Sequence, residues 1–261
     1  MPDLPLAAPD APALPALAFD AETEIAALAA RYLRAQKGPI QLVNLIGGQV
    51  EDLAARLPVR TRARIDEATV LALRFAYGAA KGSHRRRPGG DLAHRAAAAA
   101  LGALGGLGGL PSALAELPVT TTTILRSLQE IARFHGEDPA DEATRLACLQ
   151  VLGAGGPLAE DDGTDFAFLG ARITLTGATL QGLIAQVAPR FAAALAQKLA
   201  AKAVPVLGAA AGAAVNLAFA RYYQEMAHVH FGLRRLARVG ALHATAAFRS
   251  EVEAARRLRH G

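Results

Sequence analysis

The side chains best suited to chemistry in this chain are two histidines near its C-terminal end, His228 and His230. Residues two apart on a helix point to nearly opposite faces, so this pair cannot bind one metal ion without distortion. Glu225 and His228 have the i, i+3 spacing of half a di-metal carboxylate site, but the sequence contains no second Glu-x-x-His. We therefore predict no metal site and hydrogen-bonded, structural histidines. His230 remains the only credible general base if the protein is an enzyme.

Other catalytic patterns are missing from the sequence. It contains no G-x-S-x-G, and its single cysteine, Cys148, lies in the apolar stretch LACLQVL, where a buried and inert thiol is expected. The glycines between residues 102 and 109 lack G-x-G-x-x-G spacing, and no Gly-Lys-Ser/Thr occurs. We therefore assign no catalytic, metal-binding or cofactor-binding residue.

Two segments are rich in small apolar residues, and the helices must be arranged around them. Residues 96–115 are free of charge and contain five glycines, and residues 203–220 contain one polar side chain, Asn216. Gly208 and Gly212 form a G-x-x-x-G pattern, which favours close contact between two helices. Both segments are near the length that crosses a bilayer. We expect a buried hairpin or a peripheral membrane contact, and whether either segment enters a bilayer stays open.

The composition predicts an all-α protein. Ala, Leu, Arg, Glu and Gln are good helix formers, and no alternation of polar and apolar residues is long enough for a sheet. We expect a multi-helix bundle with the two Gly/Ala-rich helical segments packed at its centre. Residues 1–19 read as a disordered lead-in, residues 20–261 as a single domain, and residues 82–90 as a polar hinge. The expected helices cover residues 20–36, 39–57, 59–80, 91–101, 118–136, 138–153, 166–201, 205–236 and 241–258.

The charge balance narrows the class of partner. The formal net charge is +5, supplied mostly by arginine, while aromatic residues make up 5% and tryptophan is absent. Nucleic-acid modules usually add aromatic or glycine-basic repeats, so we expect no nucleic-acid partner. An anionic membrane surface or a membrane protein fits better. The N-terminus lacks a basic region before its apolar residues, and one cysteine suits a reducing compartment. We expect a cytoplasmic protein, peripheral at the inner face of the membrane.

Several polar side chains interrupt otherwise apolar helices. Buried charges are costly unless they are paired, so we expect several of these side chains to pair with one another across helices. They are Arg126, Glu130, Arg145, Arg172, Asn216 and Arg234. Asn216 and His230 are fourteen residues apart, about 21 Å along one helix, so each needs a partner from another helix. Arg126 and Glu130 are the first partners to consider.

Three segments, residues 103–118, 124–156 and 203–236, resemble the EcsC protein family of bacteria, in family order within residues 60–240. The resemblance implies a helical, intracellular protein. The family is named after the third product of an operon that also encodes an ATP-binding-cassette transporter, and its activity is not established. The family pattern falls on Gly106, Gly109, Pro111, Arg126, Glu130, Gly136, Pro205, Gly208, Asn216, His230, Phe231 and Arg234.

This chain departs from the family pattern at three places. Glu116 stands where an aspartate is usual in the family. An aromatic residue usually comes directly before the glycine at position 136, whereas in this chain His135 separates Phe134 from Gly136. Ala237 stands where a glutamate is usual. Because the resemblance implies no reaction, we expect a non-enzymatic module at the cytoplasmic membrane face or on a membrane partner. The alternatives are a hydrolase acting on lipid or peptide and a carrier of an apolar ligand. An exposed apolar patch rimmed by arginines would favour the first.

Overall fold

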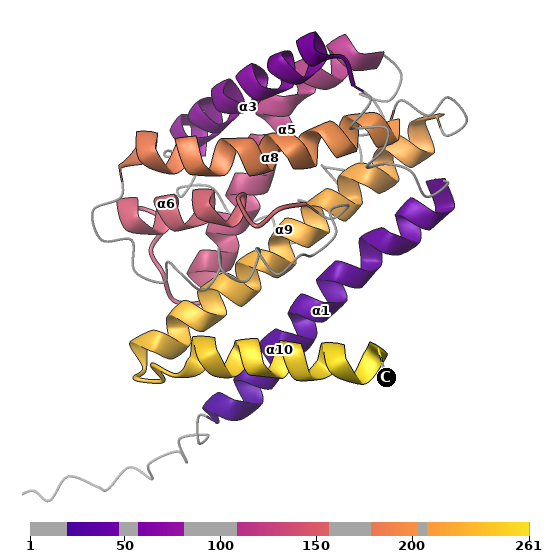
Figure 1. Ribbon diagram of the computed structural model, residues 1–261. Helices are drawn as coiled ribbons and strands as arrows, with labels where there is room; N and C mark the ends of the chain where they lie inside the picture. Colours follow the sequence, from indigo (N-terminus) through magenta and orange to yellow (C-terminus); the bar gives the residue numbers. More distant parts are fainter. Residues whose placement is uncertain (1–19, 47–56, 81–108, 157–178, 203–207, 261) are drawn as a thin grey trace, which may run out of the picture.

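The computed structural model describes residues 20–46, 57–80, 109–156, 179–202 and 208–260, and every regular element in these ranges is an α-helix (Figure 1). The helices are α1 (Ala21–Ile46), α3 (Val59–Ala80), α5 (Gly109–Phe134), α6 (Glu142–Val151), α8 (Leu180–Lys202), α9 (Gly208–Arg238) and α10 (Ala244–His260). The prediction of an all-α multi-helix bundle is confirmed. The lead-in at 1–19 and the hinge at 82–90 lie outside the described residues.

Helix α9 is the central element of the bundle. It has 31 residues and is therefore about 46 Å long, enough to run across the whole molecule. On one side it contacts α5, α6 and α8, and α3 covers α5 and α8. On the other side α1 and α10 pack on α9 and on each other (Figure 1). The polar groups that α9 buries therefore lie at interfaces with several different helices.

Two prolines lie in the interior of helices, although the sequence predicted a helix boundary at each of them. Helix α1 continues through Gly38 and Pro39, where we expected one helix to stop and another to start. Helix α5 begins at Gly109 and has Pro118 in its interior, so the predicted start at Pro118 is wrong. The threonines that follow do not mark a helix start. Thr122 and Thr123 instead donate their hydroxyls to carbonyls four residues earlier, at 2.7 and 2.9 Å. Packing of the helices overrides the local preference in both cases.

A further helix start comes later than predicted. Helix α6 begins at Glu142 and not at 138, because the side chain of Asp138 accepts the Ala140 N–H at 2.8 Å and forms a turn. Helix α8 begins at Leu180, and the earlier part of the predicted helix, residues 166–178, lies outside the described residues. The Thr179 hydroxyl accepts the N–H of Gly182 at 3.1 Å, which is the bond of an N-cap residue. By contrast, the predicted bounds of α3 are those observed.

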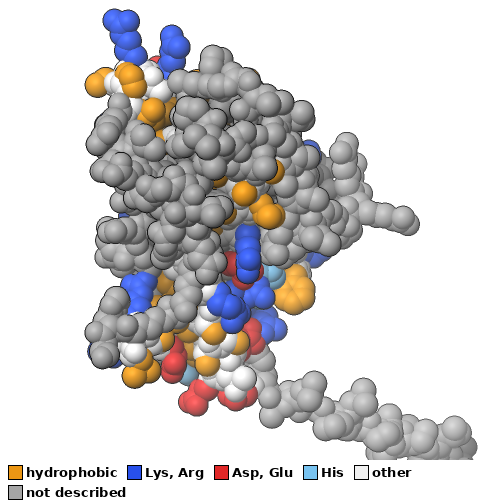
Figure 2. Space-filling view, turned by 90° about the vertical axis from the view of Figure 1, so that its right-hand side faces the viewer, with side chains coloured by type: hydrophobic (Ala, Val, Ile, Leu, Met, Phe, Trp, Pro, Cys, Tyr) orange, Lys and Arg blue, Asp and Glu red, His pale blue; other side chains and the backbone are white. Residues whose placement is uncertain are grey.

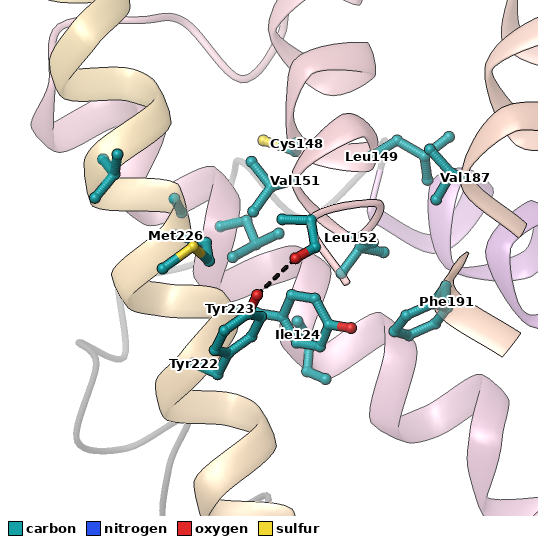
Figure 3. Close-up of a cluster of buried hydrophobic side chains, with 14 of the residues drawn as sticks. Ile124, Cys148, Leu149, Val151, Leu152, Val187, Phe191, Tyr222, Tyr223 and Met226 are labelled. Carbon is teal, nitrogen blue, oxygen red and sulfur yellow. Dashed lines mark hydrogen bonds between the residues drawn. The ribbon is translucent and has the colours of Figure 1, made fainter. Parts of the chain in front are cut away.

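Part of the buried core lies where α9 meets α6. The residues of α6 are buried from Thr144 to Val151. Tyr222 and Tyr223 of α9 bury their rings here (Figure 3). Their hydroxyls donate to the carbonyls of Ala154 and Gly155, respectively, both at 2.6 Å. A buried tyrosine hydroxyl needs such a partner, and these carbonyls follow the end of a helix. The tyrosine pair therefore fixes the C-terminal end of α6 against α9.

Close helix contacts occur at two glycines. A Cβ atom on Gly232 of α9 would lie 2.7 Å from Cδ2 of Leu28 on α1. A Cβ atom on Gly156 would lie 2.6 Å from the Cβ and 3.2 Å from the Cα of Ala194 on α8. The contact predicted for Gly208 and Gly212 falls where the structure does not describe the packing of α9. The described close approaches are therefore at other glycines.

Replacing Gly156 with alanine should lower the free energy of unfolding by about 1–3 kcal/mol, because the new methyl group would overlap the Cβ of Ala194 and press on its Cα in α8. Gly78 is the matched control. It lies on the exposed side of α3, and a Cβ atom added there would have nothing within 4 Å, so alanine should stabilise by up to about 1 kcal/mol. Urea unfolding of both variants measures the difference. Equal midpoints for the two variants would contradict the close packing at Gly156.

Candidate functional site

The first polar cluster on α9 surrounds Glu116 of α5. Asn216 donates its Nδ2 to Oε1 of Glu116 at 2.9 Å, and the Thr120 hydroxyl donates to the same oxygen at 3.0 Å. Nζ of Lys198, on α8, lies 3.8 Å from this oxygen. Asn216 therefore has a partner on another helix, as predicted, but the partner is Glu116 and not Arg126 or Glu130. We call these four residues the Glu116 cluster.

The Glu116 cluster is a buried ion pair with hydrogen-bonding support. Lys198 is buried and its Nζ also lies 5.9 Å from the centre of the Phe219 ring, within range of a cation–π contact. A buried ion pair contributes little net stability, but removing one partner leaves a costly unpaired charge. The cluster therefore favours one relative placement of α5, α8 and α9. Lysine at 198 and glutamate at 116 were not predicted as site residues.

The second polar cluster surrounds Glu137, just after the turn that ends α5 at Gly136, whose φ is +80°. The buried Glu137 carboxylate accepts hydrogen bonds from Arg234 Nε at 2.6 Å and Nη2 at 3.0 Å. It also accepts from Arg238 Nη1 at 2.5 Å and from the Thr144 hydroxyl at 3.3 Å. This Glu137 cluster ties the α5–α6 turn to the last turns of α9. Arg234 therefore pairs with a residue of another element, but that residue is Glu137 and not one of the polar side chains named from the sequence.

The groups around Glu137 have strongly altered proton affinities. Burial raises the pKa of Glu137, but hydrogen bonds and charge from Arg234 and Arg238 outweigh it and hold the pKa below its usual value. Burial, helped by Arg234, lowers the pKa of His230 to about 3. Burial, helped by Glu137, raises the pKa of the Cys148 thiol. The carboxylate is therefore charged at neutral pH, while the imidazole and the thiol are neutral.

These surroundings weigh against catalysis by His230 or Cys148. His230 is fully buried, and the predicted hydrogen bond from another helix is not seen at its Nε2 within the described residues. A general base works best with a pKa near the operating pH and within reach of its substrate. His230 has neither property. Cys148 is buried and protonated, as the sequence predicted for an inert thiol.

The third polar cluster is a pair of histidines at the end of α5. Nε2 of His135 lies 3.2 Å from Nδ1 of His228, and the ring of Phe134 packs edge-on against both imidazoles. His228 therefore faces α5, whereas His230 lies near Arg234 and Glu137. The two histidines therefore have different neighbours, in agreement with the prediction that they point to different faces of the helix. His135 was not singled out from the sequence.

The described residues contain no arrangement of three or more His, Cys, Asp or Glu side chains that could hold a metal ion. Glu225, the possible carboxylate of a half-site, instead pairs with Nε of Arg31 on α1 at 3.3 Å. Separately, no described helix is long and apolar enough to cross a bilayer.

The other predicted positions are scattered through the bundle. Phe231 is a buried core residue, and Arg126 and Glu130 lie half-buried on α5. Arg145 donates to the carbonyl of Ala140 and lies 5.8 Å from the centre of the Tyr77 ring. The positions outside the described residues, or in helix ends whose packing is not described, are Gly106, Gly109, Pro111, Arg172, Pro205 and Gly208.

The structure also assigns roles to residues that the sequence did not single out, above all Glu137 and Arg238. The sequence does contain a pattern from which these two residues could have been predicted. Arg234 and Arg238 have i, i+4 spacing and therefore share one face of a helix, which predicts a common acidic partner. An acidic residue directly after the glycine that ends α5 was available to fill that role.

The fold and its clusters define a class: an all-α bundle in which one long central helix meets buried polar side chains from its neighbours. The sequence model described as the EcsC protein family matches residues 89–236, more than half of the chain, so this chain belongs to the EcsC family. The match includes α5, α6, α8 and nearly all of α9, and leaves α1, α3 and α10 outside. The family match begins at residue 89, later than the segment of residues 60–240 over which the sequence analysis placed the resemblance. Searches of curated proteins and of solved structures found no match.

Proposed function

We propose that this EcsC-family protein is a non-enzymatic module that binds an anionic membrane surface. The observation that carries the proposal is a group of large apolar side chains exposed near the ends of α5 and α9. Phe134 is 77% exposed, Val239 is 58% exposed and Leu242 is 84% exposed. Contiguous exposed apolar patches mark sites of interaction with partners or membranes, and we infer that these three side chains form such a patch.

Cationic side chains accompany these apolar groups. Arg133 precedes Phe134 on α5, and Arg238, the last residue of α9, precedes Val239; both arginines are exposed. On one face of the molecule, Lys and Arg side chains gather beside hydrophobic side chains and a histidine, with Asp and Glu side chains among them (Figure 2). Each cation near an anionic lipid surface contributes about 1 kcal/mol, and apolar side chains add to this by entering the interface. The net charge of +5 acts in the same direction.

Flotation with lipid vesicles tests the proposal. The protein should float with vesicles that contain phosphatidylglycerol and should stay behind with pure phosphatidylcholine, and added salt should release it. Replacing Phe134 and Leu242 together by glutamine should reduce binding several-fold, since both side chains are exposed and the fold should persist. Leu258→Gln is the matched control, because Leu258 is 86% exposed and lies near the other end of α10.

Two results would overturn the proposal. One is equal recovery of the protein with anionic and neutral vesicles, or no recovery with either. The other is a loss of binding in Leu258→Gln as large as in the double variant at Phe134 and Leu242, because that would remove any special role for this end of the bundle.

A further inference from the structure

Helix α3 lies at one edge of the bundle, and α10 lies at the opposite edge (Figure 1). It packs on α5 and α8, and among the residues that it buries are Leu73, Ala76 and Tyr77. Two other large apolar side chains of α3, Leu71 and Phe75, are 65% and 60% exposed. They are four residues apart and are therefore neighbours on one face of the helix. This face carries an apolar strip that no described helix covers.

Charged side chains flank the apolar strip at regular positions. Each residue of a helix turns by about 100°, so positions three, four and seven residues from Leu71 lie within about 60° of it. The exposed residues at these positions between 64 and 78 form what we call the outer face of α3: Arg64, Glu67, Leu71, Arg74, Phe75 and Gly78. At Gly78 the face is open, because a Cβ atom added there would have nothing within 4 Å.

The outer face of α3 is complementary to itself when two copies lie antiparallel. A two-fold axis beside Leu71 places each residue opposite the one that is equally far on the other side of Leu71 in the second copy. Leu71 then meets Leu71 of the second copy. Phe75 lies between Leu71 and Arg64 of the second copy, where its ring can pack on the leucine and under the guanidinium. Gly78 lies opposite the same Arg64 and leaves room for its side chain.

Opposite charges also meet in this arrangement. Arg74 lies beside Glu67 of the second copy, and the symmetry repeats the pair, so the contact contains two ion pairs. Nη2 of Arg74 donates to Oε1 of Gln181 on α8 at 3.1 Å. That amide is neutral, so it orients the guanidinium without cancelling its charge. A parallel arrangement would instead place Arg74 beside Arg74 and Glu67 beside Glu67, and like charges repel.

We propose that the outer face of α3 binds the same face of a second copy of this chain, with the two helices antiparallel and crossing at Leu71. Glu67 would repel an anionic lipid surface, whereas it completes the pairing with a second copy. The contact involves mainly one helix from each copy, so it belongs to the small class of interfaces and the dimer should be weak. It uses neither Phe134 nor Leu242, and it therefore does not depend on the proposed membrane surface.

Sedimentation of the full chain over a range of concentrations tests the contact. Wild type should associate reversibly into a dimer in the micromolar range and no further, because a contact between identical faces closes on itself. Leu71→Gln should raise the dissociation constant about tenfold or more, since each copy loses a leucine from the contact. Leu258→Gln is the matched control, because Leu258 is another exposed leucine, on α10, and should leave the dimer unchanged.

Reversal of single charges tests the antiparallel geometry. Glu67→Arg and Arg74→Glu should each be monomeric alone, because each variant places like charges opposite one another in both pairs. An equal mixture of the two variants should form a mixed dimer about as strong as that of wild type, since both pairs then join opposite charges. This recovery also shows that neither variant has lost its fold.

Three results would overturn the proposal. One is a wild type that stays monomeric throughout the micromolar range. If Leu71→Gln then also loses flotation with anionic vesicles, the outer face of α3 binds lipid and not a second copy. Another is a wild-type dimer that persists unchanged in Leu71→Gln and in both charge reversals, because the dimer would then use another surface. The third is a mixture of Glu67→Arg and Arg74→Glu that stays monomeric while wild type dimerises.

Discussion

Replacing Glu137 with glutamine should lower the free energy of unfolding by about 3–5 kcal/mol, the largest effect that we expect from one substitution. The carboxylate is buried and accepts four hydrogen bonds, three of them from Arg234 and Arg238. Glutamine would leave the mostly buried Arg234 without its counter-charge and would direct an amide N–H₂ toward guanidinium donors. The midpoint and slope of urea unfolding measure the loss. Glu253→Gln, exposed on α10, should change stability by less than about 0.5 kcal/mol.

The two arginines of the Glu137 cluster should not be equivalent. Arg234 makes two of the bonds and is mostly buried, whereas Arg238 is 43% exposed and can be replaced in part by water. Arg234→Gln should therefore cost several times more than Arg238→Gln, whose effect should resemble that of a surface pair, at most about 1 kcal/mol. If Glu137→Gln unfolds at the same urea concentration as wild type, the cluster does not hold the α5–α6 turn on α9.

As the pH is lowered, the protein should begin to lose stability well before the pH reaches the range in which carboxylates become protonated. The pKa of His230 is about 3 and that of His135 is about 4 in the folded protein, mainly because both imidazoles are buried. An unfolded histidine has a pKa near 6.5, so below that pH the unfolded chain binds protons that the folded chain does not. The stabilising effect of keeping both imidazoles neutral is therefore complete above pH 6.5 and declines as the pH falls.

The expected loss is about 2 kcal/mol per histidine at pH 5, or roughly 4 kcal/mol for both. Urea unfolding between pH 7.5 and 5 measures this loss of stability. Glu137 does not contribute in this pH range, because its pKa is lowered and its stabilising effect declines only below the usual range of a carboxyl group. His230→Gln and His135→Gln should each remove about half of the pH dependence, whatever their stability at pH 7.5. His243→Gln, at an exposed position, should leave the slope unchanged. A flat profile in wild type contradicts the burial of both imidazoles.

Sequence alone determined the helical class and much that depends on local pattern. The bounds of α3 were predictable because its apolar positions repeat with the helical period and its ends are marked locally. The inert state of Cys148 followed from its apolar neighbours, and the family followed from three segments in order. The need of Asn216 for a partner also followed, because an amide in an apolar run must be hydrogen-bonded.

Only the tertiary structure decided which partners meet. Glu116 and Asn216 are 100 residues apart, and Glu137 and Arg234 are 97 apart, so their pairing depends on how each helix is rotated and shifted against its neighbours. No local spacing encodes that rotation. The passage of α5 through Pro118 has the same origin, since contacts with α3 and α9 along its length outweigh the one backbone hydrogen bond that proline removes. Periodicity shows which face of a helix is buried, whereas packing of the whole bundle determines what that face touches.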